Sequence, residues 1–438
     1  MTSARPLPPG SRVAVIGSGA AALGAALTLS QRHHVTILER DGHAGGHANT
    51  LEVARTDGGR VAVDTGFIVY NQRTYPNLIR LFDHLKVATQ ATDMSFGVSL
   101  DGGTLEYSGE SLTGLFGQPV NLLRPRFLGM VKDILRFYRE APALLARSDS
   151  GPSLGDYLAA NRYGEAFIDD HLLPMAAAIW SAPAATMMAF PAISFVRFCT
   201  NHGLLQLTDR PQWRTVVGGS REYVSRLLER SHADLWLNAA VAEIRRLPAG
   251  VAVVTKSGRR DRFDHVVVGT HADEALAMLA DPTEAERRLL GAFGYQKNLA
   301  VLHSDPSLMP RRRALWASWN YLGATGPDGA RRLSVTYWMN RLQALDPTLP
   351  LFVTLNPACE PQASAVHARI PYHHPVFDAR AMAAQRRLKD IQGVDRVSFC
   401  GSYFGYGFHE DALAAGLAAA TALGCPAPWA DLTAQAAE

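Results

Sequence analysis

Five small residues follow a short apolar run near the N-terminus, and their spacing suits the binding of a phosphate. The run covers residues 12–16, and the small residues are Gly17, Ser18, Gly19, Ala21 and Ala22. In this spacing the first glycine permits a tight turn, and the second lets the backbone approach a pyrophosphate. A small third residue, Ala22, lets the following helix pack closely on the strand. The free N–H groups at the start of that helix form an anion site.

An acidic residue follows at the distance that a nucleotide ribose requires. A second apolar run, residues 35–38, leads directly into Glu39, which lies 22 residues after Gly17. At this distance a carboxylate can accept hydrogen bonds from ribose hydroxyls. We assign the adjacent Arg40 to the same site. Strand, glycine turn, helix, strand and acid together predict a dinucleotide-binding βαβ unit. The alternative is an ordinary βαβ unit that contains glycines.

A second glycine pair, Gly45-Gly46, precedes His47. NAD dehydrogenases need no such pair, but the arrangement resembles the flavoprotein superfamily of monoamine and polyamine oxidases, phytoene desaturases and protoporphyrinogen oxidases. There a glycine pair and a basic residue, usually Arg, lie along the FAD phosphates, and the resemblance implies this role for Gly45, Gly46 and His47. It also implies that a segment beginning with Gly66, Phe67 and Ile68 passes close to the isoalloxazine ring.

The C-terminal part of the sequence resembles the segment that closes the FAD site in the same superfamily. Gly401 ends a predicted strand, and a loop leads through Phe408 and His409 into a helix of small residues. The resemblance implies that this helix points at the flavin pyrimidine, where its N-terminal amides would stabilise the negative charge of reduced flavin. Phe408 and His409 would lie beside the ring. Cys400 precedes Gly401 and does not occupy the position used for covalent attachment, so we expect noncovalent FAD.

The resemblance further implies that Val241 packs on the adenine, after the chain has returned to the cofactor domain. No second G-x-G-x-x-G follows, so we expect no nicotinamide domain, and electrons would pass to oxygen, a quinone or a protein carrier. The sequence shows no acid–base pair, which leaves His409, Tyr406 and Lys297 as catalytic candidates. Resembling amine oxidases place a lysine like Lys297 on a strand, where it holds a water at flavin N5. The alternative is an exposed strand lysine.

These motifs predict an α/β fold, a Rossmann-like FAD-binding domain of the GR2 type with an inserted α+β substrate domain. The FAD-binding domain is expected in three segments, residues 11–85, 209–275 and 391–425. The substrate domain is expected in residues 86–208 and 276–390. Within it, a basic and apolar helical pattern over residues 121–145 would suit an anionic lipid surface or a solvated helix face. Soft side chains between residues 172 and 190, including Met175, Ile179, Met187 and Phe190, would suit a pocket wall or the core.

Composition narrows the class of protein. The chain of 438 residues is 47% hydrophobic and 19% charged, with a formal net charge of +3, which predicts no nucleic-acid partner. Four dispersed cysteines predict neither a disulfide framework nor a zinc site, and the paired His373 and His374 lack a carboxylate at metal-binding spacing. We expect no metal, no secretion signal and no transmembrane helix. A cytoplasmic location is expected, with contact at the inner face of the membrane as an alternative.

Residues 12–423 further resemble a bacterial branch of predicted NAD/FAD-binding proteins related to amine oxidases. The resemblance is carried by residues 63–71, 204–207, 212–221 and 405–411. Members of this branch accompany cyclopropane-fatty-acid-synthase-like methyltransferases, and some are linked to desaturation of methylated acyl chains on the way to furan fatty acids. This implies an FAD-dependent oxidoreductase that desaturates an apolar lipid by hydride transfer to flavin N5, with a methyltransferase in the same pathway. The alternatives are a fatty acid double-bond isomerase, an amine oxidase and a non-catalytic flavin- or lipid-binding protein.

Overall fold

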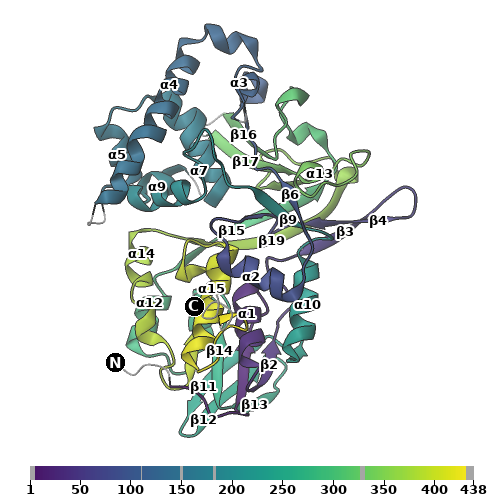
Figure 1. Ribbon diagram of the computed structural model, residues 1–438, viewed down its shortest axis with the longest axis vertical. Helices are drawn as coiled ribbons and strands as arrows, with labels where there is room; N and C mark the ends of the chain where they lie inside the picture. The colour runs from purple at the N-terminus through teal and green to yellow at the C-terminus, as the bar shows by residue number, and fades with distance from the viewer. Residues whose placement is uncertain (1–4, 110, 148–150, 181–183, 326–330, 431–438) are drawn as a thin grey trace, which may run out of the picture.

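A parallel sheet of five short strands forms around the first apolar run. That run is largely β-branched, as expected for a strand buried on both faces. The strand order is β10 (Asp234–Trp236), β2 (His34–Leu38), β1 (Arg12–Ile16), β14 (His265–Val268) and β20 (Val397–Phe399). These strands come from the three segments predicted for the cofactor domain. The computed structural model describes residues 5–109, 111–147, 151–180, 184–325 and 331–430 (Figure 1).

Two helices of small residues pack against each other on this sheet. All ten residues of α1 (Ala20–Leu29) are buried, and α15 (His409–Ala422) lies against it. A Cβ atom on Gly416 would lie 2.0 Å from the backbone oxygen of Ala21, and one on Gly24 would lie 2.6 Å from a Leu413 methyl carbon. The two helices therefore approach more closely than larger residues permit. Helix α10 (Arg221–Ser231) packs on α1, and α2 (Pro76–Leu85) packs on α15.

A seven-stranded, mostly antiparallel sheet forms the second layer. Its order is β19 (Val366–Val376), β15 (Gly294–His303), β18 (Phe352–Leu355), β17 (Arg331–Trp338), β16 (Trp319–Thr325), β7 (Phe96–Leu100) and β8 (Leu105–Ser108). Within the described part of this sheet, β16 and β7 form the one parallel pair. Figure 1 shows β15 and β19 crossing the middle of the molecule, above the parallel sheet. Residues 371–376, which have no regular sequence pattern, belong to the long strand β19.

Helices cover this sheet at the end of the molecule farthest from the parallel sheet (Figure 1). The long helix expected over residues 121–145 is wrong as one element, because it is divided into η2 (Pro119–Leu123), α4 (Pro125–Glu140) and η3 (Ala141–Ala146). Pro125 and Pro142 lack the N–H that a continuous helix would use, so α4 begins at Pro125 and η3 begins at Ala141, one residue before Pro142. The other helices here are α3 (Leu112–Leu115), α5 (Leu154–Ala160), α6 (Glu165–Phe167), α7 (Leu173–Trp180), α8 (Ala184–Ala189) and α9 (Ala192–Asn201).

Small sheets and helices complete the fold. The strands are β11 (Val241–Leu247), β12 (Gly250–Thr255) and β13 (Arg260–Phe263); β3 (Thr50–Ala54) and β4 (Arg60–Asp64); and β5 (Tyr70–Asn71), β9 (Trp213–Val216) and β6 (Thr89–Thr92). The remaining helices are α11 (Ala272–Met278), α12 (Glu284–Leu290), α13 (Met339–Leu342) and α14 (Ala379–Gln385). Within the described ranges, no helix combines the length and apolar character needed to span a bilayer.

Candidate functional site

One large cavity runs from the carboxyl ends of the parallel strands to the seven-stranded sheet. Its volume is about 1380 Å³. Pockets for single small ligands usually measure roughly 300–1,000 Å³, so this cavity has room for a dinucleotide and a second molecule. Ligands of open α/β sheets bind at the carboxyl ends of the strands, where this cavity begins. We describe its two halves as the nucleotide end and the substrate end.

The glycine turn after β1 forms the start of the nucleotide end. Gly17 has a φ of +91°, and its N–H donates to the carbonyl of Leu38 at 2.8 Å. A Cβ atom on Gly19 would meet no atom within 4 Å, so this position opens directly onto the cavity. Ser18 and Ala21 also line it. Ala22 does not, because its side chain packs one layer behind, 2.7 Å from where a Cβ of Gly269 would lie.

The predicted ribose acid and its neighbour lie at the same end. Glu39 is buried and lines the cavity; one carboxylate oxygen accepts from the Ser18 hydroxyl at 2.5 Å, and the other accepts from the Asp41 N–H at 2.9 Å. Arg40 lines the cavity and pairs with Glu274 at 2.5 Å. Val241 lies at this end too. The predicted ribose and adenine residues are therefore gathered around one part of the cavity.

The second glycine pair brings His47 next to the glycine turn. A Cβ on Gly46 would lie 3.2 Å from the Cα of Gly19. Gly45 does not line the cavity, but its N–H donates to the carbonyl of Ser18 at 3.1 Å and holds the two loops together. The ring of His47 stacks on Tyr372 with centroids 4.7 Å apart, and its Nε2 is buried without a hydrogen-bond partner among the described residues.

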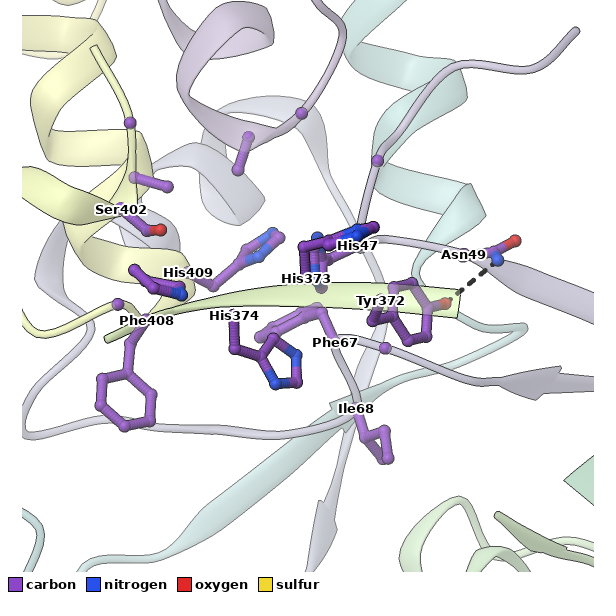
Figure 2. A pocket seen from close by; sticks show the side chains of 18 of the residues that line it. His47, Asn49, Phe67, Ile68, Tyr372, His373, His374, Ser402, Phe408 and His409 are labelled. Carbon is purple, nitrogen blue, oxygen red and sulfur yellow. Dashed lines mark hydrogen bonds between the residues drawn. The ribbon is translucent and has the colours of Figure 1, made fainter. Parts of the chain in front are cut away.

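The environment keeps His47 uncharged. Burial, followed by the neighbouring charges of His374, His271, His409 and His373, holds the pKa of His47 well below its usual value. Figure 2 shows His47, His373 and His374 gathered around β19, with the hydrogen bond from Asn49 to the Tyr372 hydroxyl. A bound anion would reverse this effect, because a negative charge nearby favours the protonated imidazole.

The C-terminal segment closes the cavity from the opposite side. Gly401, Tyr406, Phe408 and His409 line it, as do Gly66, Phe67 and Ile68. The rings of Phe67 and His409 stack with centroids 3.9 Å apart, and the Nε2 of His409 hydrogen bonds the Tyr223 hydroxyl at 2.5 Å. Burial lowers the pKa of His409 to about 3, so its imidazole is neutral at physiological pH. This residue therefore contributes a neutral ring and not a cation.

A buried carboxylate fixes the loop that precedes α15. Asp411 accepts from the backbone N–H groups of Tyr406 and Phe408, both at 2.9 Å. Burial raises its pKa to about 6 in spite of these two hydrogen bonds. A Cβ on Gly405 would overlap the carboxylate at 2.2 Å, so the loop can pass only with glycine at this position. The hydrogen bonds to Asp411 thus set where Phe408 enters the cavity.

Lys297 is not brought together with the other candidates. It lies on β15 with its side chain exposed and does not line the cavity. Tyr295, two residues earlier on the same strand, does line it. A lysine ammonium is strongly hydrated, and burying it without a partner would cost several kcal/mol. The structure therefore gives Lys297 the exposed position that the sequence left as an alternative.

The substrate end is lined mainly by large apolar and aromatic side chains. They are contributed by strands and helices far apart in sequence: Met94, Phe96, Tyr138, Met175, Ile179, Phe198, Leu204, Trp213, Trp319, Tyr337, Leu355 and Ile370. The charged residue Asp93 accepts from Ser95, Ser318 and Arg341. Of the predicted soft wall, Met175 and Ile179 face this space, whereas Met187 and Phe190 pack in the core.

His202, which the sequence gave no reason to select, lies at the junction of the two ends. It follows α9, and its ring stacks on Phe198 with centroids 3.9 Å apart; Phe198 in turn stacks on Phe408 at 4.7 Å. Its Nδ1 lies 3.0 Å from the Phe198 carbonyl. A carbonyl only accepts, so Nδ1 carries the proton and Nε2 keeps its lone pair. Burial lowers the pKa of His202 to about 4, which leaves the imidazole neutral.

A π-helical turn, η4 (Ile168–Leu172), brings a second unexpected histidine into the cavity. His171 lines the substrate end, and its Nδ1 lies 3.1 Å from the Tyr107 hydroxyl. Its Nε2 is buried without a partner among the described residues, and burial lowers its pKa to about 4. A π turn contains one more residue than an α turn, and such turns are frequent at functional sites.

Comparison with known proteins identifies the family. The model of the flavin-containing amine oxidoreductases matches residues 23–308. The chain belongs to this family. It is thus an FAD-dependent oxidoreductase with the GR2-type fold expected from the sequence. No curated protein sequence matches it.

Solved structures share the fold of this flavoprotein over nearly its whole length. A triple mutant of putrescine oxidase aligns with a TM-score of 0.67 and 16% identity, covering 97% of this chain and 99% of the other. The CLA-producing fatty acid isomerase from P. acnes aligns with a TM-score of 0.63 and 17% identity, and the alignment covers 94% of this chain and 98% of the isomerase. Cyclohexylamine oxidase from Brevibacterium oxydans IH-35A aligns with a TM-score of 0.64 and 15% identity, and the alignment covers 95% of this chain and 99% of the oxidase. At these identities the similarity establishes the fold and not the substrate.

The nucleotide end of this flavoprotein fits FAD. The open Cβ position of Gly19 and the N-terminus of α1 suit a pyrophosphate, and buried Glu39 suits a ribose. The unpartnered Nε2 of His47 would gain a hydrogen-bond partner from the cofactor.

Proposed function

We propose that this flavoprotein dehydrogenates an apolar, acyl-chain-like substrate. The observation that carries the proposal is the continuous apolar and aromatic lining of the substrate end, which leads from Phe408 toward Met94 and Phe96. Burying a hydrocarbon chain along such walls contributes about 0.8 kcal/mol for each CH₂ group. Polar substrates would lose hydration along these walls, where hydrogen-bonding groups are few. A methyl-branched acyl chain made by a methyltransferase of the same pathway is the substrate class that we favour.

The chain's own residues would position this substrate and take up one proton. FAD, when bound, supplies the hydride acceptor. The second hydrogen must leave the adjacent carbon as a proton, and we assign its uptake to the Nε2 lone pair of His202. Nδ1 of that ring is occupied by the Phe198 carbonyl, which fixes the tautomer. The aromatic stack of Phe198 and Phe408 would orient the acyl chain of the substrate, and the apolar walls would exclude water.

A second candidate function is isomerisation of a fatty acid double bond, which the shared fold of the P. acnes fatty acid isomerase favours. In that case the hydride would be returned to the substrate, and no external electron acceptor would be needed. An amine oxidase would instead release ammonia and peroxide from an amine. Among the described lining residues, Phe408 alone falls at the place of an aromatic residue that would flank an amine, which counts against this function.

Anaerobic mixing of the holoprotein with extracted lipids separates these functions. Dehydrogenation predicts bleaching of the visible flavin absorbance and a product lighter by two hydrogens in mass spectrometry. Isomerisation predicts a product of unchanged mass without lasting bleaching. Bleaching by simple amines but not by lipids would replace the proposal with an amine oxidase. Flavin that neither lipids nor amines reduce, together with unchanged lipids, would leave only a binding function.

A further inference from the structure

Large aliphatic side chains are concentrated on the surface of one short stretch of the chain. Between residues 112 and 135 six of them are exposed: Leu112 by 76%, Val120 by 45%, Leu122 by 52%, Leu123 by 83%, Leu128 by 43% and Leu135 by 48%. Elsewhere in the described chain only Leu207, Val217 and Leu237 are comparably exposed. Single exposed leucines are ordinary, whereas a cluster of this kind marks an interaction site. We call these six residues and the basic residues between them the docking surface.

Helix α4 shows how the docking surface is built. One face buries Phe127, Met130, Ile134 and Phe137 in the core. The solvent face carries Leu128, Lys132, Leu135 and Arg139, at helical spacings of four, three and four residues. Residues so spaced share one side of a helix, so leucine and basic residues alternate along a single exposed stripe. Figure 1 shows α3 and α4 together at the end of the molecule remote from the parallel sheet.

The charge of this region is strongly positive. Residues 112–147 contain six Arg or Lys against two Asp or Glu, although the whole chain has a net charge of only +3. Arg126 pairs with Asp170, and Arg139 pairs with Glu140. Lys132 and Arg124 form no ion pair with any residue that the structure describes. Positive charge therefore remains available beside the exposed leucines.

We propose that the docking surface binds an anionic lipid bilayer. Interfacial helices combine an apolar face with Lys and Arg, and they place their leucines about 5–10 Å into the boundary between headgroups and acyl chains. The long basic side chains can then reach the lipid phosphates. The basic residues between the exposed leucines complement the negative surface potential of an anionic bilayer. The proposal rests on the surface alone and holds whichever reaction the cavity performs.

The docking surface adjoins the substrate end of the cavity. Gly109 lines the cavity, is exposed, and precedes Leu112 by three residues. Tyr138 lines the cavity from α4, three residues after the exposed Leu135. An acyl chain could therefore pass from the bilayer into the apolar part of the cavity near Gly109. This arrangement would spare a lipid substrate the cost of crossing water.

Vesicle flotation of the full-length holoprotein tests the proposal. Vesicles of phosphatidylcholine alone are compared with vesicles of phosphatidylcholine and phosphatidylglycerol in equal amounts. The protein is expected to float with the anionic vesicles, less strongly as salt is raised. The double variant Leu122→Asp/Leu123→Asp should bind at least about tenfold more weakly. Lys132→Gln should weaken binding about fivefold, since each basic residue near an anionic surface contributes about 1 kcal/mol.

Matched controls separate docking from misfolding and from self-association. Leu237→Asp, an equivalent change at an exposed leucine outside the docking surface, should leave flotation unchanged. Flavin content reports whether each variant is folded. Failure of the folded wild-type protein to float with anionic vesicles would overturn the proposal, as would equal flotation of Leu122→Asp/Leu123→Asp. A dimer in light scattering that the double variant abolishes, without vesicle binding, would assign the surface to a second copy of the chain. None of these measurements depends on turnover.

Discussion

The two ends of the cavity are built in different ways. At the nucleotide end glycines such as Gly17, Gly19 and Gly46 bring the backbone to the cavity wall and permit close approach. At the substrate end long side chains from several helices and strands converge. A backbone wall is set by short, local motifs, whereas a side-chain wall depends on how distant elements pack. The cofactor can therefore be predicted from the sequence, whereas the substrate cannot.

The largest effect of a single substitution on stability is expected where α15 meets α1. Gly416→Val would place a side chain 2.0 Å from the Ala21 carbonyl, and no rotamer change can relieve a clash with backbone. We expect a loss of more than about 4 kcal/mol in the free energy of unfolding, measured by urea denaturation. Gly129→Ala in α4 is the matched control. Its Cβ meets no atom within 4 Å, so a gain of up to about 1 kcal/mol is expected. Similar stability of both variants would show that the two helices are not tightly packed.

Gly19→Leu should remove FAD and leave the fold intact. The added side chain meets no protein atom at its Cβ but projects into the nucleotide end. FAD affinity should fall at least about 100-fold, or roughly 3 kcal/mol, in a fluorescence titration. The unfolding midpoint of the cofactor-free variant should equal that of the cofactor-free wild type. A variant purified with full flavin content would refute our assignment of the nucleotide end.

His202→Gln tests the substrate end. If His202 takes up the substrate proton, kcat should fall about 100-fold while flavin content and absorbance stay unchanged. His367→Gln provides a control, because His367 hydrogen bonds Ser304 outside the cavity. Unchanged kcat for His202→Gln would exclude this residue as the proton acceptor.

Stability should fall when the pH is lowered from 7 to 5. Burial holds the pKa of His171, His202 and His374 at about 4 and that of His409 at about 3, whereas an unfolded histidine titrates near 6.5. Between these values the unfolded chain binds more protons, so each neutral histidine contributes stability that is lost as pH falls. At pH 5 the loss is up to about 2 kcal/mol for each.

Two buried carboxylates act in the opposite direction. The pKa of Asp64 and of Asp411 is raised to about 6, so protonation stabilises the folded state as the pH falls below 6. By pH 5 this protonation adds about 1 kcal/mol per carboxylate to the free energy of unfolding, which is less than the loss at each histidine. Urea denaturation at both pH values should therefore give a lower free energy of unfolding at pH 5. In His202→Gln the decrease should be smaller, and a pH-independent wild type would contradict the buried, neutral state of these histidines.

The smallest effect concerns His47. An anionic cofactor should raise its lowered pKa, so binding of FAD would take up a proton and become tighter as the pH falls from 8 to 6. His47→Gln should bind FAD about tenfold more weakly at pH 6 and lose this pH dependence. Titrations of both proteins at several pH values measure the slope. An unchanged slope in His47→Gln would assign the effect to the other histidines around β19.

Most residues predicted for the nucleotide end line the cavity because their motifs are local in sequence, whereas Ala22 and Gly45 lie behind the wall. Gly17, Gly19 and Glu39 lie in one βαβ unit, and Gly401 ends a strand of the same sheet. The substrate end was beyond sequence reasoning, since a single histidine after an amphipathic helix, as at His202, has no distinguishing neighbours. Lys297 shows the converse, because a matching strand does not determine which part of its length meets the cavity: Tyr295 lines the cavity, whereas Lys297, on the same face two residues later, does not. The single helix expected over residues 121–145 was wrong, because the regular spacing of its leucines indicates one helix although two prolines interrupt it.

The π turn at residues 168–172 gives this flavoprotein a simple route to a different specificity. Each residue advances an α-helix by about 100°, so the extra residue in the turn rotates the following helix, α7, relative to α6. Removing one residue from the turn would restore regular α-helical spacing and move the His171 imidazole away from the cavity wall. A neighbouring side chain would take its place, while the glycine loops that hold the cofactor would be untouched. A single-codon deletion could thus remodel the substrate end without a change in redox chemistry.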